Sequence, residues 1–342
     1  MFGTDQNKVL IVAELSANHL QNFDLALKTV EAMAKSGADA VKVQTYTPDT
    51  ITIKCNSSDF LIKHDTIWDG KTLYDLYQKA YLPWEWHYKL KSLAEDFGLL
   101  FFSTPFDKTA VDFLESLDVP FYKIASFEIT DIPLIEYVAS KGKPVIISTG
   151  IATLSDIESA ILACHRMKNY QIALLKCVSS YPTSLNEVNL RSIPYLEKIF
   201  NVVVGLSDHT LSFSVSVAAV TLGAKIIEKH FILDRSLGGP DAAFSLEPDE
   251  FKRMVLAIRE IEEALGESSY KLSEKQVKAR VFSRSLYVVQ DVSAGDIISE
   301  SNVRSIRPGY GLHPKYLKDI IGKKFRKSLS KGTPLRWEYI EL

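Results

Sequence analysis

The segments VVVGLSDHT (residues 202–210) and AKIIEKHF (residues 224–231) decide the fold. Each begins as an aliphatic run and ends in polar side chains, as expected of a parallel strand buried on both faces. Runs of this kind predict strands at residues 9–15, 40–45, 99–104, 121–125, 145–149, 172–178, 202–205 and 224–231. Amphipathic stretches separate these strands, and the alternation is typical of repeated βα units.

Glycines mark the ends of several predicted helices. Residues 24–36, 84–97 and 248–265 have helical patterns that stop at Gly37, Gly98 and Gly266. Glycine readily adopts the left-handed conformation that closes a helix. Eight regular repeats favour a closed (β/α)8 TIM barrel, which takes about 250 residues, over a doubly wound open sheet. A dinucleotide-binding fold is disfavoured because no GxGxxG motif follows the first strand.

The predicted catalytic barrel covers residues 1–266, and a charged linker at residues 267–282 leads to a smaller domain. In that domain, residues 283–342, the segments SAGDIISESNV (293–303) and SKGTPLRWEYI (330–340) share a Ser-x-Gly start and apolar residues at matched offsets. This match predicts a pseudo-symmetric β-rich unit. Within the barrel, the long excursion at residues 46–71 follows the second strand on the catalytic face and is predicted to be a functional lid.

Composition and charge narrow the possible partners. The 342 residues include 40 basic and 42 acidic side chains, giving a net charge of -2, and no lysine-rich run, so nucleic acid is not expected. No stretch approaches the roughly 20 apolar residues of a membrane span. Three cysteines without CxxC spacing do not make a disulfide framework, which favours a reducing compartment. We therefore expect a cytoplasmic protein that binds a small molecule.

Polar side chains interrupt nearly every predicted strand at its carboxyl end, where barrel enzymes build their active sites. Any one such residue is most often part of a polar loop. The complete set favours an active site. Its members are Glu14, Lys42, Gln44, Thr104, Lys123, Ser126, Ser148, Thr149, Ser179, Tyr181, Ser207, His209, Glu228 and His230.

Two of these residues are histidines at the ends of adjacent strands. Period-two alternation directs Ser207 and His209 to one side of a strand, and Glu228 and His230 to the same side of the next. A histidine alone is more often a hydrogen-bonded core residue, but a pair suits a divalent metal and leaves open coordination positions for a substrate. We expect Asp208 and Glu228 to be hydrogen-bond partners of the two imidazoles. The other histidines, His64, His87, His165 and His313, have no such neighbours and receive no role.

Two lysines, Lys42 and Lys123, lie within the second and fourth predicted strands. A lysine inside a barrel is costly unless it meets an anion. With hydroxyl groups as neutral donors, these lysines predict a cradle for phosphate and carboxylate. The hydroxyl groups belong to Thr104, Ser126, Ser148 and Ser207. The alternative is the Schiff-base lysine of a pyruvate aldolase, which needs one lysine with a lowered pKa. Two lysines among several hydroxyls favour anion binding.

A series of motifs along almost the whole chain resembles the bacterial sialic-acid synthase family. In order, the motifs are AELSANH, KVQTYTPDTI, STPFD, YKIASFEI, ISTGI, SSYPTS, GLSDHT, EKHFIL, GGPDAAFSLEP and RSIRPGYG. The resemblance implies condensation of phosphoenolpyruvate with an open-chain amino-sugar aldehyde, which gives a nine-carbon keto acid and inorganic phosphate. It also implies an antifreeze-like (SAF-type) C-terminal domain and a homodimer with swapped C-terminal domains.

Within the family, AELSANH, TIWDGKTLYDLY (residues 66–77) and SSYPTS are most similar to members whose sugar is 2,4-diacetamido-2,4,6-trideoxy-L-altrose, a route associated with flagellin glycosylation. The resemblance implies that His209 and His230 bind a metal of the manganese or magnesium class. Glu14 and Asp241 would contact the sugar, and Glu128 would help to activate water. The positions implied to hold phosphoenolpyruvate are Lys42, Thr104, Lys123, Ser126, Ser148 and Ser207.

Arg307 and Phe282 match residues that, in the family, reach into the partner subunit's site. One departure affects the substrate: Ser179, two residues before Tyr181, stands where sialic-acid synthases have asparagine. A serine hydroxyl donates one hydrogen bond and an asparagine amide two, so this contact must differ. Three alternatives stay open: a synthase for N-acetylneuraminate or legionaminate, an aldolase, and a non-catalytic carbohydrate-binding protein.

Overall fold

The computed structural model describes residues 8–63 and 67–341. His64 and residues 65 and 66, which belong to the predicted lid, therefore lie outside the described residues. The chain divides into two units, and the boundary falls between Gly266 and Glu267. The two units are considered separately below.

Unit 1 is a closed barrel of eight parallel strands in which β1 pairs with both β2 and β8. The strands are β1 (Leu10–Glu14), β2 (Ala40–Thr45), β3 (Leu100–Pro105), β4 (Tyr122–Ile124), β5 (Val145–Ser148), β6 (Ile172–Lys176), β7 (Val203–Asp208) and β8 (Ile226–His230). The predicted TIM barrel is confirmed. The predicted end of the seventh strand at Gly205 is wrong, because Leu206 and Ser207 continue the pairing with β8.

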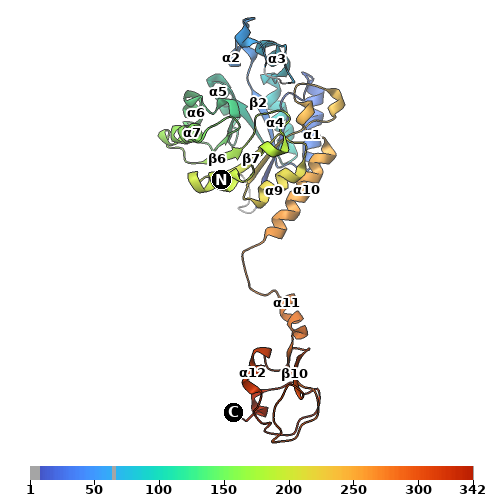
Figure 1. The fold of residues 1–342 in the computed structure, drawn as a ribbon. Helices are drawn as coiled ribbons and strands as arrows, with labels where there is room; N and C mark the ends of the chain where they lie inside the picture. Colours follow the sequence, from blue (N-terminus) through green and yellow to red (C-terminus); the bar gives the residue numbers. More distant parts are fainter. Residues whose placement is uncertain (1–7, 64–66, 342) are drawn as a thin grey trace. The chain divides into compact units, whose positions relative to one another are not determined.

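Helices surround the barrel and bury their apolar faces against its outer surface (Figure 1). They are α1 (Phe23–Lys35), α4 (His87–Asp96), α5 (Lys108–Ser116), α6 (Ile132–Ala139), α7 (Leu154–Arg166), α8 (Ser192–Phe200), α9 (Phe213–Thr221) and α10 (Pro248–Leu265). Local sequence explains their ends: the Asn22 side chain accepts a hydrogen bond from Leu25 N at the start of α1, and Gly37 follows its end at φ 86°.

The barrel lumen has its own small core, which includes Leu10, Val12, Phe102, Phe121 and Ile226. Because side chains alternate along each strand, the last apolar position on the luminal face of these strands is followed two residues later by a polar one. Along β8, for example, the luminal face changes from an isoleucine to a glutamate and then a histidine. The lumen is therefore packed below and polar at the carboxyl end of the barrel, as in TIM-barrel enzymes.

The excursion after β2 contains regular structure instead of a bare loop. It holds α2 (Pro48–Ile51), the 3-10 turn η1 (Ser58–Phe60) and α3 (Leu73–Ala80), and an antiparallel bridge joins Leu61 to Thr72. The segment predicted as a lid at residues 46–71 therefore continues in the structure through α3.

Unit 2 contains α11 (Glu274–Ala279), α12 (Leu317–Ile320) and a two-stranded antiparallel sheet of β9 (Ser285–Val288) and β10 (Val303–Ile306). The two repeated segments adopt matching turns, with Gly295 at φ 86° and Gly332 at φ 87°. Five residues after each initial serine, Ile298 and Leu335 are both fully buried in the unit's core. The pseudo-symmetry is therefore real, although backbone bridges and turns form more of the unit than strands do.

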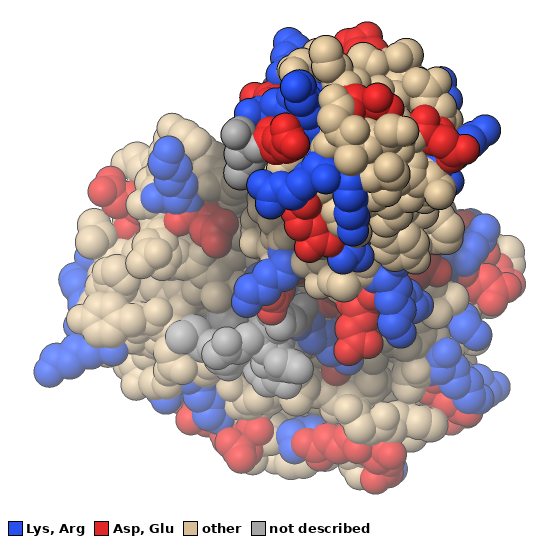
Figure 2. Space-filling model, turned by 90° about the horizontal axis from the view of Figure 1, so that it is seen from below, with Lys and Arg blue, Asp and Glu red and all other residues tan. Residues whose placement is uncertain are grey.

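The surface carries both signs of charge. Figure 2 shows basic and acidic side chains interspersed over the face in view. Over the part of the chain that the structure describes, no helix is long and apolar enough to cross a membrane.

Candidate active site at the carboxyl end of the barrel

A buried network of ion pairs lies at the strand ends. Lys42 Nζ is 2.7 Å from a Glu14 carboxylate oxygen and 3.4 Å from Glu228 Oε1. Lys123 Nζ donates to both Glu228 oxygens, at 2.7 and 2.9 Å, and the Ser207 hydroxyl donates to Glu228 Oε1 at 2.9 Å. The two lysines are thus brought together as predicted, but carboxylates of the chain itself neutralise them.

The network keeps most of its members charged. Burial alone would lower the pKa of Lys42, but the charges of Glu14 and Glu228 outweigh burial and raise it above the usual value. For Glu228, burial would raise the pKa, but the two lysines hold it well below the usual range. The pKa of Lys123 is lowered, because burial outweighs the attraction of Glu228. Lys42 Nζ also donates to the Thr104 hydroxyl at 3.4 Å. Lys123 directs two donors to Glu228, so one of its three donors is left for an arriving anion.

The two predicted metal ligands meet at the ends of β7 and β8. The ring centroids of His209 and His230 are 5.2 Å apart. His209 Nδ1 donates to the Val178 carbonyl at 2.9 Å, which leaves its Nε2 lone pair free for a ligand bond. His230 Nδ1 is buried with no hydrogen-bond partner in the described chain, and burial together with His209 holds its pKa well below the usual value.

Burial would lower the pKa of His209, but Cys177 and the Val178 carbonyl outweigh burial and raise it. An imidazole binds a divalent transition metal through a nitrogen lone pair, in its neutral form. Among the described residues, no group of three or more histidine, cysteine or acidic side chains is arranged to hold a metal. That His209 and His230 hold a metal stays a prediction from the sequence.

The expectation that Asp208 and Glu228 bind the imidazoles is wrong. The Asp208 side chain points to the opposite face of β7, where Lys229 Nζ lies 2.7 Å away and the Ser216 hydroxyl donates at 2.9 Å. Strand alternation is the reason, because residue 208 faces away from the lumen when 207 and 209 face into it. Glu228 faces the lumen but is bound to the lysines.

A glycine makes room for a cluster of small polar side chains. A Cβ atom on Gly150 would lie 2.1 Å from the Ser179 hydroxyl, 2.7 Å from the Ser126 hydroxyl and 3.1 Å from Cys177 Sγ. The hydroxyls of Ser179 and Ser148 are buried and have no hydrogen-bond partner among the described residues. Ser126 and Ser148 are two of the hydroxyl groups predicted to bind an anion together with the lysines, and this role stays a prediction.

Sequence reasoning missed Cys177 and Gly150. Cys177 Sγ lies 3.9 Å from His209 Nδ1, in contact with the proposed metal ligand. Its signal was the same alternation that singled out the neighbouring serine, because residues 175, 177 and 179 share one face of β6 and its continuation. Burial would raise the pKa of this thiol, but His209 and nearby donors lower it to about 7.

The groups expected to contact the sugar lie at β1 and after β8. Asp241 accepts hydrogen bonds from the Ser16 hydroxyl and, at 3.2 Å, from Ala17 N. Gln44 Nε2 donates to the Ser16 hydroxyl at 3.0 Å and to Glu14 at 3.3 Å. Glu14 is fully buried and Gln44 lines the cavity, so Glu14 supports the wall from behind.

A cavity of about 570 Å³ opens above these groups. His230, Asp241, Glu128 and Tyr181 line it. The Tyr181 ring lies 4.5 Å from that of His209. Burial raises the pKa of Glu128 to about 7, and its Oε2 atom is buried without a hydrogen-bond partner in the described chain. A carboxyl group in this state can take up a proton near neutral pH.

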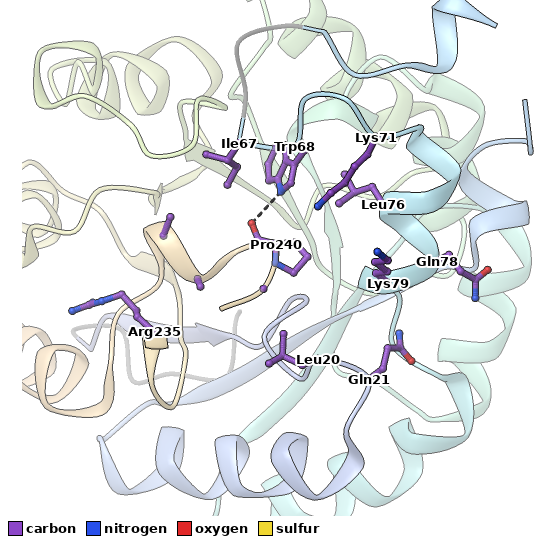
Figure 3. A pocket seen from close by; sticks show the side chains of 13 residues that line it. Leu20, Gln21, Ile67, Trp68, Lys71, Leu76, Gln78, Lys79, Arg235 and Pro240 are labelled. Atoms are coloured by element: carbon purple, nitrogen blue, oxygen red, sulfur yellow. Dashed lines mark hydrogen bonds between the residues drawn. The ribbon is translucent and has the colours of Figure 1, made fainter. Parts of the chain in front are cut away.

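A second cavity, of about 740 Å³, adjoins the first (Figure 3). Trp68, Leu76 and Pro240 border both cavities, and Trp68 Nε1 donates to the Pro240 carbonyl at 3.0 Å. The indole also lies 5.6 Å from the Tyr181 ring, so it forms part of the partition between the cavities. Phe282 and Arg307 belong to unit 2, where both are exposed.

A TIM barrel with two lysines, buried hydroxyl groups and two lumen-facing histidines at its strand ends, beneath a cavity, has the layout of a barrel enzyme's active site. The sequence profile of the NeuB family matches residues 29–270, and that of the SAF domain matches residues 283–341. The chain belongs to the NeuB family.

Relatives with assigned activities cover nearly the full length. The chain is 48% identical to pseudaminic acid synthase of Campylobacter jejuni over 98% of this chain and 97% of that protein. It is 40% identical to N,N'-diacetyllegionaminic acid synthase of Legionella pneumophila over 97% and 94%. The crystal structure of N-acetylneuraminic acid synthetase from Leptospira borgpetersenii, in complex with citrate, matches with a TM-score of 0.71 and 32% identity over 80% of this chain and 90% of that one.

Proposed function

We propose that this protein condenses phosphoenolpyruvate with 2,4-diacetamido-2,4,6-trideoxy-L-altrose to give pseudaminic acid and inorganic phosphate. The observation that carries the proposal is the anion cradle beside the histidine pair: Lys42, Lys123 and the unpartnered hydroxyls of Ser148 and Ser179 lie at the same strand ends as His209 and His230. The higher identity to a pseudaminic acid synthase than to a legionaminic acid synthase supports the choice of sugar.

In this proposal the cradle holds phosphoenolpyruvate by its charged groups. The two ammonium groups face the phosphate and carboxylate, and the serine hydroxyls donate to the remaining oxygens. The charges of Glu14 and Glu228 favour the charged form of Lys42, and the Glu228 carboxylate holds Lys123 in place before the substrate arrives. The cradle is thus preorganised, which reduces the reorganisation needed during the reaction.

His209 and His230 would hold a divalent ion of the manganese or magnesium class. When bound, the ion supplies Lewis-acid polarisation of the sugar aldehyde. Asp241 and Gln44 line the cavity beside His230. In this proposal the Asp241 carboxylate accepts hydrogen bonds from the sugar hydroxyl groups, and the Gln44 amide donates to them.

Carbon–carbon bond formation joins C3 of phosphoenolpyruvate to the aldehyde carbon, and leaves negative charge on the aldehyde oxygen and positive charge at C2. Water then adds at C2, and Glu128 takes the proton that water loses and passes it to the former aldehyde oxygen, which becomes a hydroxyl group. Cleavage of the bond between C2 and the phosphate oxygen releases inorganic phosphate, which takes up the proton of the C2 hydroxyl group, and leaves the keto group. Glu128 suits this role because it lines the cavity and titrates near neutral pH.

We also propose that the active form is a homodimer in which Arg307 and Phe282 of one subunit complete the site of the other. Large apolar side chains are exposed on the segments that follow β4, β5, β6 and β7, and this supports a covering partner. They are Phe127, Ile151, Leu185 and Phe213. The free cysteines Cys55, Cys164 and Cys177 support a cytoplasmic location. A role of the product in flagellin glycosylation stays a prediction from the sequence resemblance.

The direct test is a phosphate-release assay in which the full chain, phosphoenolpyruvate and Mn²⁺ are mixed with one sugar at a time, and product mass is measured. We expect turnover with the diacetamido-trideoxy-L-altrose and a product mass equal to that sugar plus pyruvate. Faster turnover with N-acetylmannosamine or with the legionaminate precursor would reassign the substrate. A lysine adduct trapped by borohydride would instead favour the aldolase.

A further inference from the structure

Two loops meet at the edge of the cavity where the sugar is proposed to bind. The β1 loop, residues 15–22, joins β1 to α1, and the β8 loop, residues 231–247, joins β8 to α10. Ser16 of the first and Asp241 of the second both line the cavity. The position of the Asp241 carboxylate therefore depends on how the two loops are held together.

The β1 loop has a backbone conformation that its residues do not favour by themselves. Ser16, Leu20 and Gln21 have φ values of 44°, 49° and 56°. Left-handed backbone is uncommon for residues other than glycine, and it persists only where surrounding contacts fix it. The β8 loop supplies such contacts, because a Cβ atom on Gly239 would lie only 2.5 Å from Leu20 Cδ2.

The carboxamide of Asn18, a residue of the β1 loop, is a buried link between the loops. Its Nδ2 group donates to the Phe231 carbonyl at 2.9 Å and to the Ser245 hydroxyl at 2.8 Å. The Ser245 hydroxyl in turn donates to the Asp241 carbonyl at 2.6 Å. Because Phe231 directly follows His230, Asn18 ties the β8 loop down both at the histidine and at Asp241.

The chemistry of its partners fixes the direction of this amide. A carbonyl oxygen only accepts, and the single hydrogen of the Ser245 hydroxyl is directed to Asp241, so both contacts require the hydrogens of Asn18 Nδ2. Asn18 Oδ1 is buried and has no hydrogen-bond partner among the described residues. A buried acceptor without a partner lowers stability, and such costs are typical of functional sites.

The β1 loop also holds one oxygen of the Asp241 carboxylate. The Ser16 hydroxyl and Ala17 N both donate to Oδ2, the second at 3.2 Å. No side chain or amide of the described chain donates to Oδ1. The carboxylate is thus fixed through one oxygen, and the other is available to a ligand in the cavity.

We propose that Asn18 is a positioning residue, which holds the β8 loop through Phe231 and Ser245 and so places the Asp241 carboxylate for the sugar. This inference rests on the proposed condensation. The groups predicted to bind phosphoenolpyruvate lie on other strand ends, among them Lys123 and Ser148. Loss of the Asn18 hydrogen bonds therefore weakens binding of the sugar and leaves binding of phosphoenolpyruvate unchanged.

The test is steady-state phosphate release by the full chain, which gives kcat and a separate KM for each substrate. The sugar used is one that the wild-type protein turns over, so the choice of sugar does not affect the result. Asn18→Asp keeps the shape of the side chain but removes both donors. We expect the sugar KM to rise roughly 10- to 100-fold, with the KM for phosphoenolpyruvate that of the wild type.

Ser245→Ala is a milder variant that carries the test even if Asn18→Asp does not fold. It removes the link from Asn18 to the Asp241 carbonyl but keeps the bond from Asn18 to Phe231. We expect the sugar KM to rise about tenfold, again without a change in the KM for phosphoenolpyruvate. Circular dichroism checks that each variant is folded.

Asn169→Asp is the matched control. Asn169 is also buried, and its Nδ2 group donates to the carbonyls of Ala139 and Lys143 at 3.2 and 2.8 Å, before the amino ends of β5 and β6. This variant should lose stability but keep both KM values.

An unchanged sugar KM in a folded Ser245→Ala protein would overturn the proposal, and so would an equal rise in both KM values. No phosphate release by the wild-type protein with any acetamido sugar would overturn the proposed function instead, and that result is obtained without a variant.

Discussion

At the scale of single residues, the state of each ionisable side chain depends on its distance from the strand ends. Glu228, surrounded by two ammonium groups, has a pKa well below the usual range, whereas burial at the cavity wall outweighs the charge of Lys123 and raises the pKa of Glu128 to about 7. The barrel thus gives two glutamates opposite properties: one is a permanent counter-ion and the other is suited to proton transfer.

Glu128 gives a pH prediction. Burial raises its pKa to about 7, so the carboxyl group is protonated, and unable to accept a proton from water, below that value. We expect kcat to fall as pH decreases through about 7, and Glu128→Gln to lower kcat by about 10²- to 10⁴-fold and remove this acid limb. Steady-state phosphate release is measured between about pH 5.5 and 9, in steps of about half a pH unit. It gives the pH dependence of kcat and the rate of the Glu128→Gln variant.

The exposed Glu158 on α7 supplies a control for charge removal. Glu158→Gln should keep both the rate and the acid limb. An acid limb that persists unchanged in Glu128→Gln would assign the titration to another group.

The proposed metal ligands give a second prediction at this scale. His209→Ala should lose Mn²⁺ binding, measured by calorimetry on the full chain, and with it all metal-dependent turnover, while circular dichroism stays that of the wild type. His165→Ala, at the end of α7, should bind Mn²⁺ normally. Full activity of the wild-type protein in chelator-treated buffer would rule out the metal role.

At the scale of elements, β7 and β8 depend on a buried ion pair on their outer faces. Asp208 and Lys229 are register partners and almost fully buried, and each directly precedes one of the two histidines. The Lys229 ammonium also donates to the Thr210 carbonyl. The pair therefore holds together the two strand ends that present His209 and His230.

We predict that Asp208→Asn destabilises the protein, because it leaves the Lys229 ammonium buried without a counter-charge, at a cost of about 3–5 kcal/mol in the free energy of unfolding. Urea denaturation measures this value. The double change Asp208→Leu with Lys229→Met should recover most of it, since a buried ion pair and an apolar pair of similar size differ little.

The exposed ion pair of Lys141 and Asp112 serves as a comparison, and Lys141→Met should change stability little. In the same samples we expect weaker Mn²⁺ binding for Asp208→Asn than for Lys141→Met. Equal stability of Asp208→Asn and the wild type would show that the pair is not structural.

At the scale of the whole molecule, the barrel and unit 2 have separate cores. Large apolar side chains are exposed at the carboxyl end of the barrel. In unit 2, Arg307 and Phe282 are exposed. In a swapped homodimer, each site would consist of one subunit's barrel and the other subunit's unit 2.

Complementation tests the swap. Arg307→Ala and His209→Ala proteins should each be inactive or nearly so. Their co-expression should restore about a quarter of wild-type activity, because about half of the dimers are then mixed and each mixed dimer contains one intact site of two. Size-exclusion chromatography with light scattering checks that the species are dimers. If no activity returns although mixed dimers form, Arg307 acts within its own chain.

Much of the fold and part of the site could be predicted from the sequence. Period-two alternation and aliphatic runs are local, so the eight strands, the last helix and the luminal direction of His209 and His230 were readable residue by residue. The ion-pair partners of the buried charged side chains could not be predicted in this way. Lys123 was expected to bind a substrate anion, but it forms an ion pair with Glu228. Asp208 was expected to accept a hydrogen bond from an imidazole, but it forms an ion pair with Lys229.

By itself, the sequence determined that this chain forms a TIM barrel with polar strand ends, because hydrophobic periodicity and glycine-terminated helices act over a few residues. Only the tertiary structure decided which charges neutralise each other. Lys123 and Glu228 are 105 positions apart in the chain, and they meet because closing the barrel sets the register of β1, β4 and β8 around one lumen. Burial there makes each pairing energetically important, and burial depends on the closed barrel, which no local pattern contains.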